Sequence, residues 1–192
     1  MTDLQPAVKA GKRERLVDAA VQVFYERGVE KTTIADIAKV ADVPVGNVYY
    51  YFKTKDQLIE AAVEAHRRRL GHLLEELDRL GAPQERLRGL IAGWVDLRDQ
   101  AAQFGCPFGT LASEMDKRPD VLDAEIAATM RVLVDWSQRQ FAEMGREDAA
   151  ELGVALIAAY QGISLLTNTF RDPSLMKVEG DRLARWIDSL AA

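Results

Sequence analysis

The stretch from Thr32 to Leu58 constrains the fold of this chain more than any other. It reads TTIADIAKVADVPVGNVYYYFKTKDQL, and two short segments with helical spacing of apolar residues lie on either side of a tight turn. A stretch this short cannot bury a core of its own. The two segments must therefore be displayed on a larger structure that supports them.

Capping residues mark where each of the two segments begins. Thr33 is placed to cap a helix over residues 34–40, and Asp36 completes a capping-box-like pair with it. Pro44 suits the start of a second helix, which we expect to end near residue 51. Four apolar residues are spaced to form one seam between the helices: Ile37, Val43, Val48 and Phe52.

Helical spacing recurs over the rest of the chain, with Gly and Pro at the breaks. One helix is expected before the stretch and six after it, over residues 10–27, 55–80, 83–103, 108–117, 119–145, 147–170 and 179–190. The prediction is an all-α protein with about nine helices.

Composition narrows the class of protein further. With 48% hydrophobic residues, 29% charged residues and 6 Pro, the chain is typical of a folded, helix-rich protein. No apolar run approaches the roughly 18–20 residues that cross a bilayer, and the first residues lack the apolar core of a signal peptide. A cytoplasmic protein with no membrane partner is expected. A single cysteine excludes an internal disulfide, and His66 and His72 lack metal-ligand spacing, so we expect no metal or cofactor.

Charge is distributed unevenly along the chain. Residues 1–70 hold 12 Lys and Arg against 10 Asp and Glu, a net +2, and the remainder holds 13 against 20, a net −7. The basic end contains the stretch described above. Lys9, Lys12, Arg13 and Arg15 either lie against nucleic-acid phosphates or form a solvated helix start.

The stretch resembles the DNA-binding domain of the TetR family of transcriptional repressors. The resemblance rests on a joint pattern of thirteen positions: Thr33, Ile37, Ala38, Val43, Gly46, Tyr49, Tyr51, Phe52, Lys53, Thr54, Lys55, Asp56 and Leu58. It implies an N-terminal three-helix helix-turn-helix DNA-binding domain over residues 1–55. Residues 56–192 would then form a helical ligand-binding and dimerisation domain.

The family pattern makes residues 44–50 a recognition helix that enters the major groove of double-stranded DNA. Gly46 would allow close approach, Tyr49 and Tyr51 would reach the groove or a phosphate, and Thr33 and Lys55 would bind phosphates. Packing is the alternative role of the two tyrosines. The outward positions that vary in the family are candidates for base reading, and here they are Val45 and Asn47. Pro44 and Val45 stand where the family commonly has polar or basic residues.

An effector cavity is the family's expectation for the second domain. Aromatic and apolar residues predict its lining, and an apolar or aromatic ligand: Trp94, Phe104, Phe108, Leu111, Met115, Met130, Val134 and Tyr160. The alternative is that these side chains simply form the core. The Gly- and Pro-bounded segment 104–119 is expected to link the cavity to the DNA-binding domain.

Cys106 directly precedes a predicted helix, whose N-terminal field favours a thiolate. It is therefore a candidate sensor of oxidants or electrophiles, and a buried unreactive cysteine is the alternative.

The two C-terminal helices, over residues 147–170 and 179–190, have the apolar and small-residue faces that a two-fold four-helix dimer interface needs. Burial within one subunit is the alternative. The leading hypothesis is a homodimeric, ligand-responsive repressor of a palindromic DNA operator. The alternatives are a helical small-molecule binding protein or enzyme that keeps the helix-turn-helix as scaffold, and a transcriptional activator. No catalytic triad, metal-ligand set or phosphate-binding loop favours an enzyme.

Overall fold

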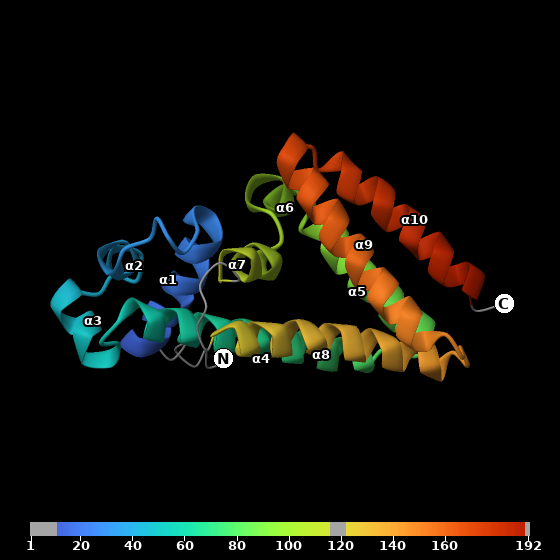
Figure 1. Cartoon of the computed structure of the whole chain (residues 1–192), viewed down its shortest axis with the longest axis horizontal. Coiled ribbons are helices and arrows are strands. Elements are labelled where there is room, and N and C mark those ends of the chain that lie inside the picture. The colour runs from blue at the N-terminus through green and yellow to red at the C-terminus, as the bar shows by residue number, and fades with distance from the viewer. Residues whose placement is uncertain (1–10, 116–121, 191–192) are drawn as a thin grey trace, which may run out of the picture. The chain divides into compact units, whose positions relative to one another are not determined.

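The computed structural model describes residues 11–115 and 122–190, and all regular structure within these ranges is helical. The ten helices seen there are labelled in Figure 1: α1 (Lys12–Arg27), α2 (Ile34–Val40), α3 (Val45–Tyr51), α4 (Lys55–Asp78), α5 (Pro83–Asp96), α6 (Arg98–Phe104), α7 (Pro107–Met115), α8 (Leu122–Glu143), α9 (Ala149–Phe170) and α10 (Ser174–Leu190). The predicted all-α fold is confirmed.

The helix expected over residues 83–103 is divided in two. The chain turns at Leu97, where φ is −89° and ψ is 8°, and α6 starts at the next residue. Arg98 Nη1 donates to the carbonyl oxygen of Val95 at 3.0 Å. This carbonyl is one of the last in α5, and the last carbonyls of a helix have no N–H partner in a further turn. No Gly or Pro marks this break, which is why the sequence predicted nine helices rather than ten.

Helix α10 begins at Ser174 rather than near residue 179. The carboxylate of Asp172 accepts a hydrogen bond from the backbone N–H of Ser174 at 2.9 Å, and this interaction caps the start of α10. Hydrogen bonds from the Ser174 side chain and then from its backbone hold the pKa of Asp172 below its usual value. The predicted end of the short helix at residue 117 and the start of the next at residue 119 lie outside the described residues.

The chain divides into two compact units between Ala65 and His66, within α4, whereas the sequence favoured a boundary at residue 55. The first unit holds α1, α2, α3 and the start of α4. The predicted seam is confirmed, because all four of its side chains are at most 5% exposed. Residues from the two flanking helices complete this core: Leu16, Val17, Ala20, Val23, Phe24, Leu58 and Ile59.

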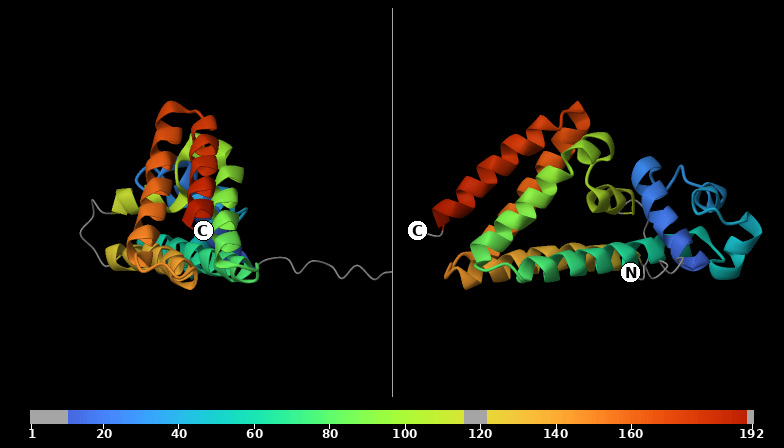
Figure 2. Two further views of the ribbon diagram at one scale, coloured as in Figure 1. Left: turned by 90° about the vertical axis from the view of Figure 1, so that its right-hand side faces the viewer. Right: turned by 180° about the vertical axis from the view of Figure 1, so that it is seen from behind.

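The second unit is a bundle in which α9 packs against α6, α8 and α10, and α5 packs against α8 and α10. α9 and α10 form an antiparallel pair joined by a short turn (Figures 1 and 2). Gly153 allows the close approach of α9 to α8, since a Cβ there would lie 2.9 Å from the backbone nitrogen of Gln138. The largest side chains at the centre are fully buried: Phe141, Leu87, Leu90, Leu156, Met176, Leu183 and Ile187.

Helix α9 is unusually apolar. The helix has 22 residues, and the mean hydropathy of its most apolar window is 1.5, so it could cross a membrane by length and composition, which contradicts the expectation that no segment is apolar enough. A single helix of this kind is weak evidence for a membrane span, because core and interface helices pass the same test. Only 28% of its most apolar window is buried within the chain, and several of its apolar side chains are exposed, among them Val154, Leu165, Leu166 and Phe170.

Candidate nucleic-acid interface and ligand cavity

The start of α2 is fixed by the capping box that the sequence predicted. The backbone N–H of Asp36 donates to Thr33 Oγ1 at 3.2 Å, and the backbone N–H of Thr33 donates to Asp36 Oδ2 at 2.9 Å. Hydrogen bonds from the Thr33 side chain and backbone lower the pKa of Asp36 below its usual value. Thr33 is exposed and ends the loop before α2, and its hydroxyl donates to Asp36 Oδ2, a bond that it would exchange to donate to a phosphate.

The turn between α2 and α3 is held by a residue far away in the sequence. Asp42 adopts the left-handed conformation with φ of 51°, and Val43 N–H donates to the carbonyl oxygen of Ala38 at 3.0 Å. Arg15 of α1 reaches this turn, where its Nη1 donates to the carbonyl oxygens of Ala41 at 3.0 Å and Asp42 at 3.3 Å. The guanidinium thus fixes the turn that sets the direction of α3.

Arg13 also contacts the protein. Its guanidinium lies 5.3 Å from the ring centroid of Phe52, the residue that follows α3. The sequence offered a phosphate-binding arm or a solvated helix start for the basic residues here. Arg15 contacts the turn that precedes α3 and Arg13 contacts the residue that follows it, Lys12 is exposed, and Lys9 lies outside the described residues.

Helix α3 turns Val48 inward and most of its other residues outward. Val45 is 42% exposed and Tyr49 is 47% exposed, and Gly46 and Asn47 are exposed as well. A Cβ on Gly46 would meet no atom within 4 Å, so the space over this position is open. Tyr51 is half-buried and packs edge-on against Tyr50, with ring centroids 5.1 Å apart.

Two lysines follow α3. Lys53 Nζ donates to the carbonyl oxygen of Tyr49 at 2.6 Å, and Lys55 Nζ donates to that of Glu30 at 3.4 Å. Thr54 caps α4 as predicted, since its Oγ1 accepts a hydrogen bond from the backbone N–H of Gln57 at 3.2 Å. Lys55 therefore stands in the first turn of a long helix, where the helix dipole favours an anion.

The residues predicted to line a cavity are buried or partly buried in the second unit. Trp94 and Tyr160 are buried and stacked, with ring centroids 4.1 Å apart. Leu111 and Met115 are also buried. The remaining four are partly buried: Phe104, Phe108, Met130 and Val134. Trp94 and Tyr160 belong to the central apolar cluster, and Phe108 and Val134 pack against it.

Phe108 meets His66 edge-on, with ring centroids 6.0 Å apart. Burial, with a smaller contribution from Arg69, lowers the pKa of His66 to about 4, so the imidazole is neutral at pH 7. Among the described residues no three His, Cys, Asp or Glu side chains cluster in a way that could hold a metal ion.

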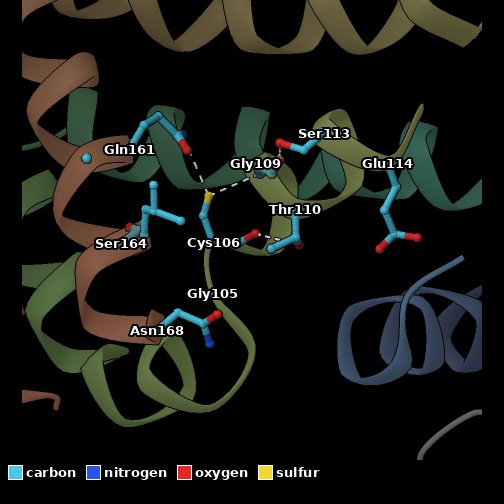
Figure 3. Close-up of a pocket in the computed structure, with 11 residues that line it drawn as sticks. Gly105, Cys106, Gly109, Thr110, Ser113, Glu114, Gln161, Ser164 and Asn168 are labelled. Carbon is cyan, nitrogen blue, oxygen red and sulfur yellow. Dashed lines mark hydrogen bonds between the residues drawn. The ribbon is translucent and has the colours of Figure 1, made fainter. Parts of the chain in front are cut away.

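A cavity of about 580 Å³ opens at the corner between α6 and α7 and against α9 (Figure 3). Its lining residues are mostly small or polar, although most of the surface that they turn to the cavity is apolar, and none of the eight predicted residues lines it. The lining residues are Gly105, Cys106, Gly109, Thr110, Ser113, Glu114, Gln161, Gly162, Ser164, Leu165 and Asn168. The signal missed in the sequence is the polar stripe Gln161, Ser164 and Asn168, which recurs at helical spacing along the most apolar helix.

Cys106 is part of this wall. It is a free cysteine with 7% exposure, and its Sγ accepts hydrogen bonds from the backbone N–H of Gly109 at 3.2 Å and from Gln161 Nε2 at 3.6 Å (Figure 3). Gly109 makes this arrangement possible, because a Cβ there would lie 2.4 Å from Gln161 Oε1.

Known proteins resemble this chain in both the helix-turn-helix unit and the helical second unit. The family model of bacterial regulatory proteins of the tetR family matches residues 16–62, and that of the tetracyclin repressor-like C-terminal domain matches residues 83–178, which is half of the chain. The chain is 28% identical over 190 residues to the HTH-type transcriptional regulator TtgR of Pseudomonas putida, covering 92% of this chain and 88% of that protein. It is 29% identical over 158 residues to the HTH-type transcriptional regulator BetI of Escherichia coli, covering 80% of each.

The fold agrees with solved structures as well. A TetR transcriptional regulator from Legionella pneumophila superposes with a TM-score of 0.84 at 17% identity, over 95% of this chain and 98% of that one. These relatives are transcriptional regulators and not enzymes. The chain, with its helix-turn-helix and its helical second unit, belongs to the TetR family of DNA-binding transcriptional regulators.

Proposed function

We propose that this regulator is a repressor that a small apolar or aromatic effector releases from a near-palindromic operator. The observation that carries the proposal is the display of α3, whose Val45, Gly46, Asn47 and Tyr49 are exposed while Val48 anchors the helix. A helix displayed in this way fits a major groove. We propose that this surface binds double-stranded DNA and that the protein acts in the cytoplasm.

Each outward residue has a distinct proposed task. Val45 meets a thymine methyl group, and Asn47 forms hydrogen bonds with base edges. Tyr49 and Tyr51 reach the groove or a phosphate. Thr33 and Lys55 bind phosphates on either side of α3, and these contacts position the protein without reading sequence.

Two copies would pair through α9 and α10, and so place two recognition helices on successive major grooves roughly 34–36 Å apart, or a multiple of that distance. The exposed apolar face of these helices supports the pairing. On α9 it includes Val154, Leu165 and Phe170, which are 50%, 66% and 65% exposed, and on α10 it includes Val178 at 65%. The small residues Ala158 and Gly162 on the same face would allow close approach of a second copy.

The effector would act by binding more tightly to a form of the dimer whose recognition helices are misplaced for the operator. It then shifts the population toward that form and lowers DNA affinity by its differential affinity for the two forms. The cavity at the α6–α7 corner, or the space between Trp94 and Tyr160 if these rings separate, would hold it.

A fluorescence-anisotropy titration with the DNA upstream of the protein's own gene tests the proposal. We expect a sequence-preferring complex that weakens steeply with salt, because phosphate contacts supply much of the binding free energy. Tyr49→Ala and Lys55→Ala should each weaken the complex about tenfold and leave the binding of small molecules unchanged. Arg139→Ala, in α8, is the control for loss of a positive charge outside both the DNA-binding unit and the helices proposed to pair.

Absence of any salt-sensitive, sequence-preferring complex would contradict the proposal and favour a small-molecule binding protein or enzyme that keeps the helix-turn-helix as scaffold. A reporter gene behind the bound DNA separates a repressor from an activator, since deletion of the regulator raises expression in the first case and lowers it in the second.

A further inference from the structure

Ser164 contributes a buried hydroxyl to the wall of the α6–α7 cavity. The residue is 1% exposed, and within the part of the chain that the structure describes its Oγ has no hydrogen-bond partner. Buried hydroxyls in native proteins are nearly always paired, because an unpaired one loses its bonds to water without replacement. The Oγ itself is almost inaccessible, so a ligand group in the cavity would complete it once the Ser164 side chain rotates toward the opening.

The other hydroxyls of the wall have already used their hydrogens. Thr110 Oγ1 donates to the carbonyl oxygen of Cys106 at 2.9 Å, and Ser113 Oγ donates to that of Gly109 at 2.9 Å. Each of these two oxygens can then only accept a further hydrogen bond. They present lone pairs, not donors, to a molecule in the cavity.

The two amide side chains of the wall also donate hydrogen bonds to other groups of the protein. Gln161 Nε2 donates to Cys106 Sγ, and Asn168 Nδ2 donates to the carbonyl oxygen of Ala102 at 3.2 Å. Each retains a carbonyl oxygen that accepts and a second N–H that can still donate. Gln161 Oε1 lies over Gly109, at the meeting point of α7 and α9. The amides balance one another in this count, and it is the oxygens of Thr110, Ser113 and Glu114 that make acceptors outnumber donors among the described lining residues.

Charge disfavours an anion in the cavity. Glu114 is the one charged residue among the described lining residues, and none of them is Lys or Arg. The first turn of α7 would attract an anion through its N–H groups, but the N–H of Gly109 is taken by Cys106 Sγ. A carboxylate placed here would meet lone pairs and a negative side chain.

We infer that the effector of this cavity is a small apolar molecule that carries a hydroxyl or amino group as hydrogen-bond donor, and that the corresponding carboxylate is rejected. The inference rests on the proposed effector function and specifies the chemistry of that effector. Pockets of this size bind small molecules through mostly apolar contact and a few placed polar groups, which here are acceptors from α7 and α9 together with Ser164.

Calorimetry of the full-length protein without DNA tests this with four probes that share one ring: benzyl alcohol, benzylamine, toluene and benzoate. Benzyl alcohol and benzylamine should bind roughly five- to tenfold more tightly than toluene, and benzoate should bind least. Ser164→Ala should remove several-fold of the alcohol's advantage over toluene without lowering the melting temperature, because the lost hydroxyl has no protein partner. Ser137→Ala is the matched control, since Ser137 is equally buried and its Oγ donates to the carbonyl oxygen of Leu133 at 2.9 Å.

Equal affinity for alcohol and toluene, tightest binding of benzoate, or no binding of benzyl alcohol would each overturn the inference, as would an unchanged preference in Ser164→Ala. If that variant does not fold, Gly109→Ala replaces it. Its methyl group would displace Gln161 Oε1, and the same loss of preference is expected. Anisotropy with operator DNA is measured in parallel. Probes that bind in the expected order and leave the DNA complex intact would contradict the effector proposal while supporting the ligand chemistry.

Discussion

The DNA-binding unit (the first unit) and the second unit, called the helical body below, organise the polar groups named here in opposite ways. In the first unit, polar side chains close on backbone groups at helix ends, as Thr33 and Asp36 do, and thereby fix the position of an exposed helix. In the body, Ser164 and Thr167 bring hydroxyls inside and leave them without partners among the described residues. In the proposed function, the satisfied polar groups hold the DNA-reading helix rigid, and the unpaired hydroxyl of Ser164 is left for a ligand.

The largest expected effect tests whether Trp94 belongs to the core or to a ligand site. Trp94→Ala should lower the free energy of unfolding by about 3–5 kcal/mol, because Trp94 is buried and stacked on Tyr160. Tyr50→Ala, in the first unit, is the control: Tyr50 is 79% exposed, and its loss should cost less than about 0.5 kcal/mol. Urea unfolding of both variants provides the measurement. A loss below about 1 kcal/mol for Trp94→Ala would place this residue on a loosely packed wall instead.

Acid should weaken the body through His66. Its pKa is about 4 in the folded protein and near 6.5 when unfolded, so the neutral imidazole contributes stability that is fully present above pH 6.5 and is lost as pH falls through about 4. The contribution is at most about 3 kcal/mol. Unfolding of the natural protein and of His66→Gln should be compared at pH 7.5 and pH 4.5. An equal loss in both would show that carboxylates alone cause the acid sensitivity.

Arg15 tests how rigidly the DNA-binding unit must be held. Arg15→Met keeps the apolar stem and removes the hydrogen bonds to the carbonyl oxygens of Ala41 and Asp42. We expect stability to fall by about 1 kcal/mol and operator affinity to fall about tenfold, since a turn that is free to move no longer presents α3 in one direction. Lys12→Met removes the same charge from the same end of α1. Equal losses of operator affinity in the two variants would show that Arg15 acts only through its positive charge and not by holding the turn.

These contacts show which parts could be read from the sequence. The capping box and the apolar seam are local, because their members lie a few residues apart and their types suit only a few geometries. The bond between Arg15 and the turn joins residues 26 positions apart, and the cavity wall joins Cys106 to Gln161 over 55 positions. Such pairs depend on how whole helices pack, which helical spacing does not specify.

The aromatic residues show a second limit. Trp94 and Tyr160 satisfy the pattern of a ligand cavity and the pattern of a core equally well, because both require large apolar side chains on the inner face of a helix. The cavity is lined by residues too small or too polar to produce an apolar pattern. The unpaired state of Ser164 appears only in the folded structure.

The smallest expected effect on stability concerns Cys106. Cys106→Ser preserves an acceptor for Gly109 N–H and should change stability by about 1 kcal/mol or less. If the thiol senses oxidants, hydrogen peroxide should weaken the operator complex of the natural protein and not that of the variant. An identical response of both proteins to every oxidant and electrophile tried would remove this role and leave Cys106 as part of the wall.

Gly162 and Leu165 belong both to the cavity wall and to the exposed apolar face of α9. If a second subunit covers that face, it also forms part of the mouth of the cavity, and assembly and ligand binding become thermodynamically linked. Ligand affinity would then depend on protein concentration, and a dilute sample would report a different dissociation constant from a concentrated one. The cell could thus adjust the sensitivity of the switch through the amount of regulator it makes.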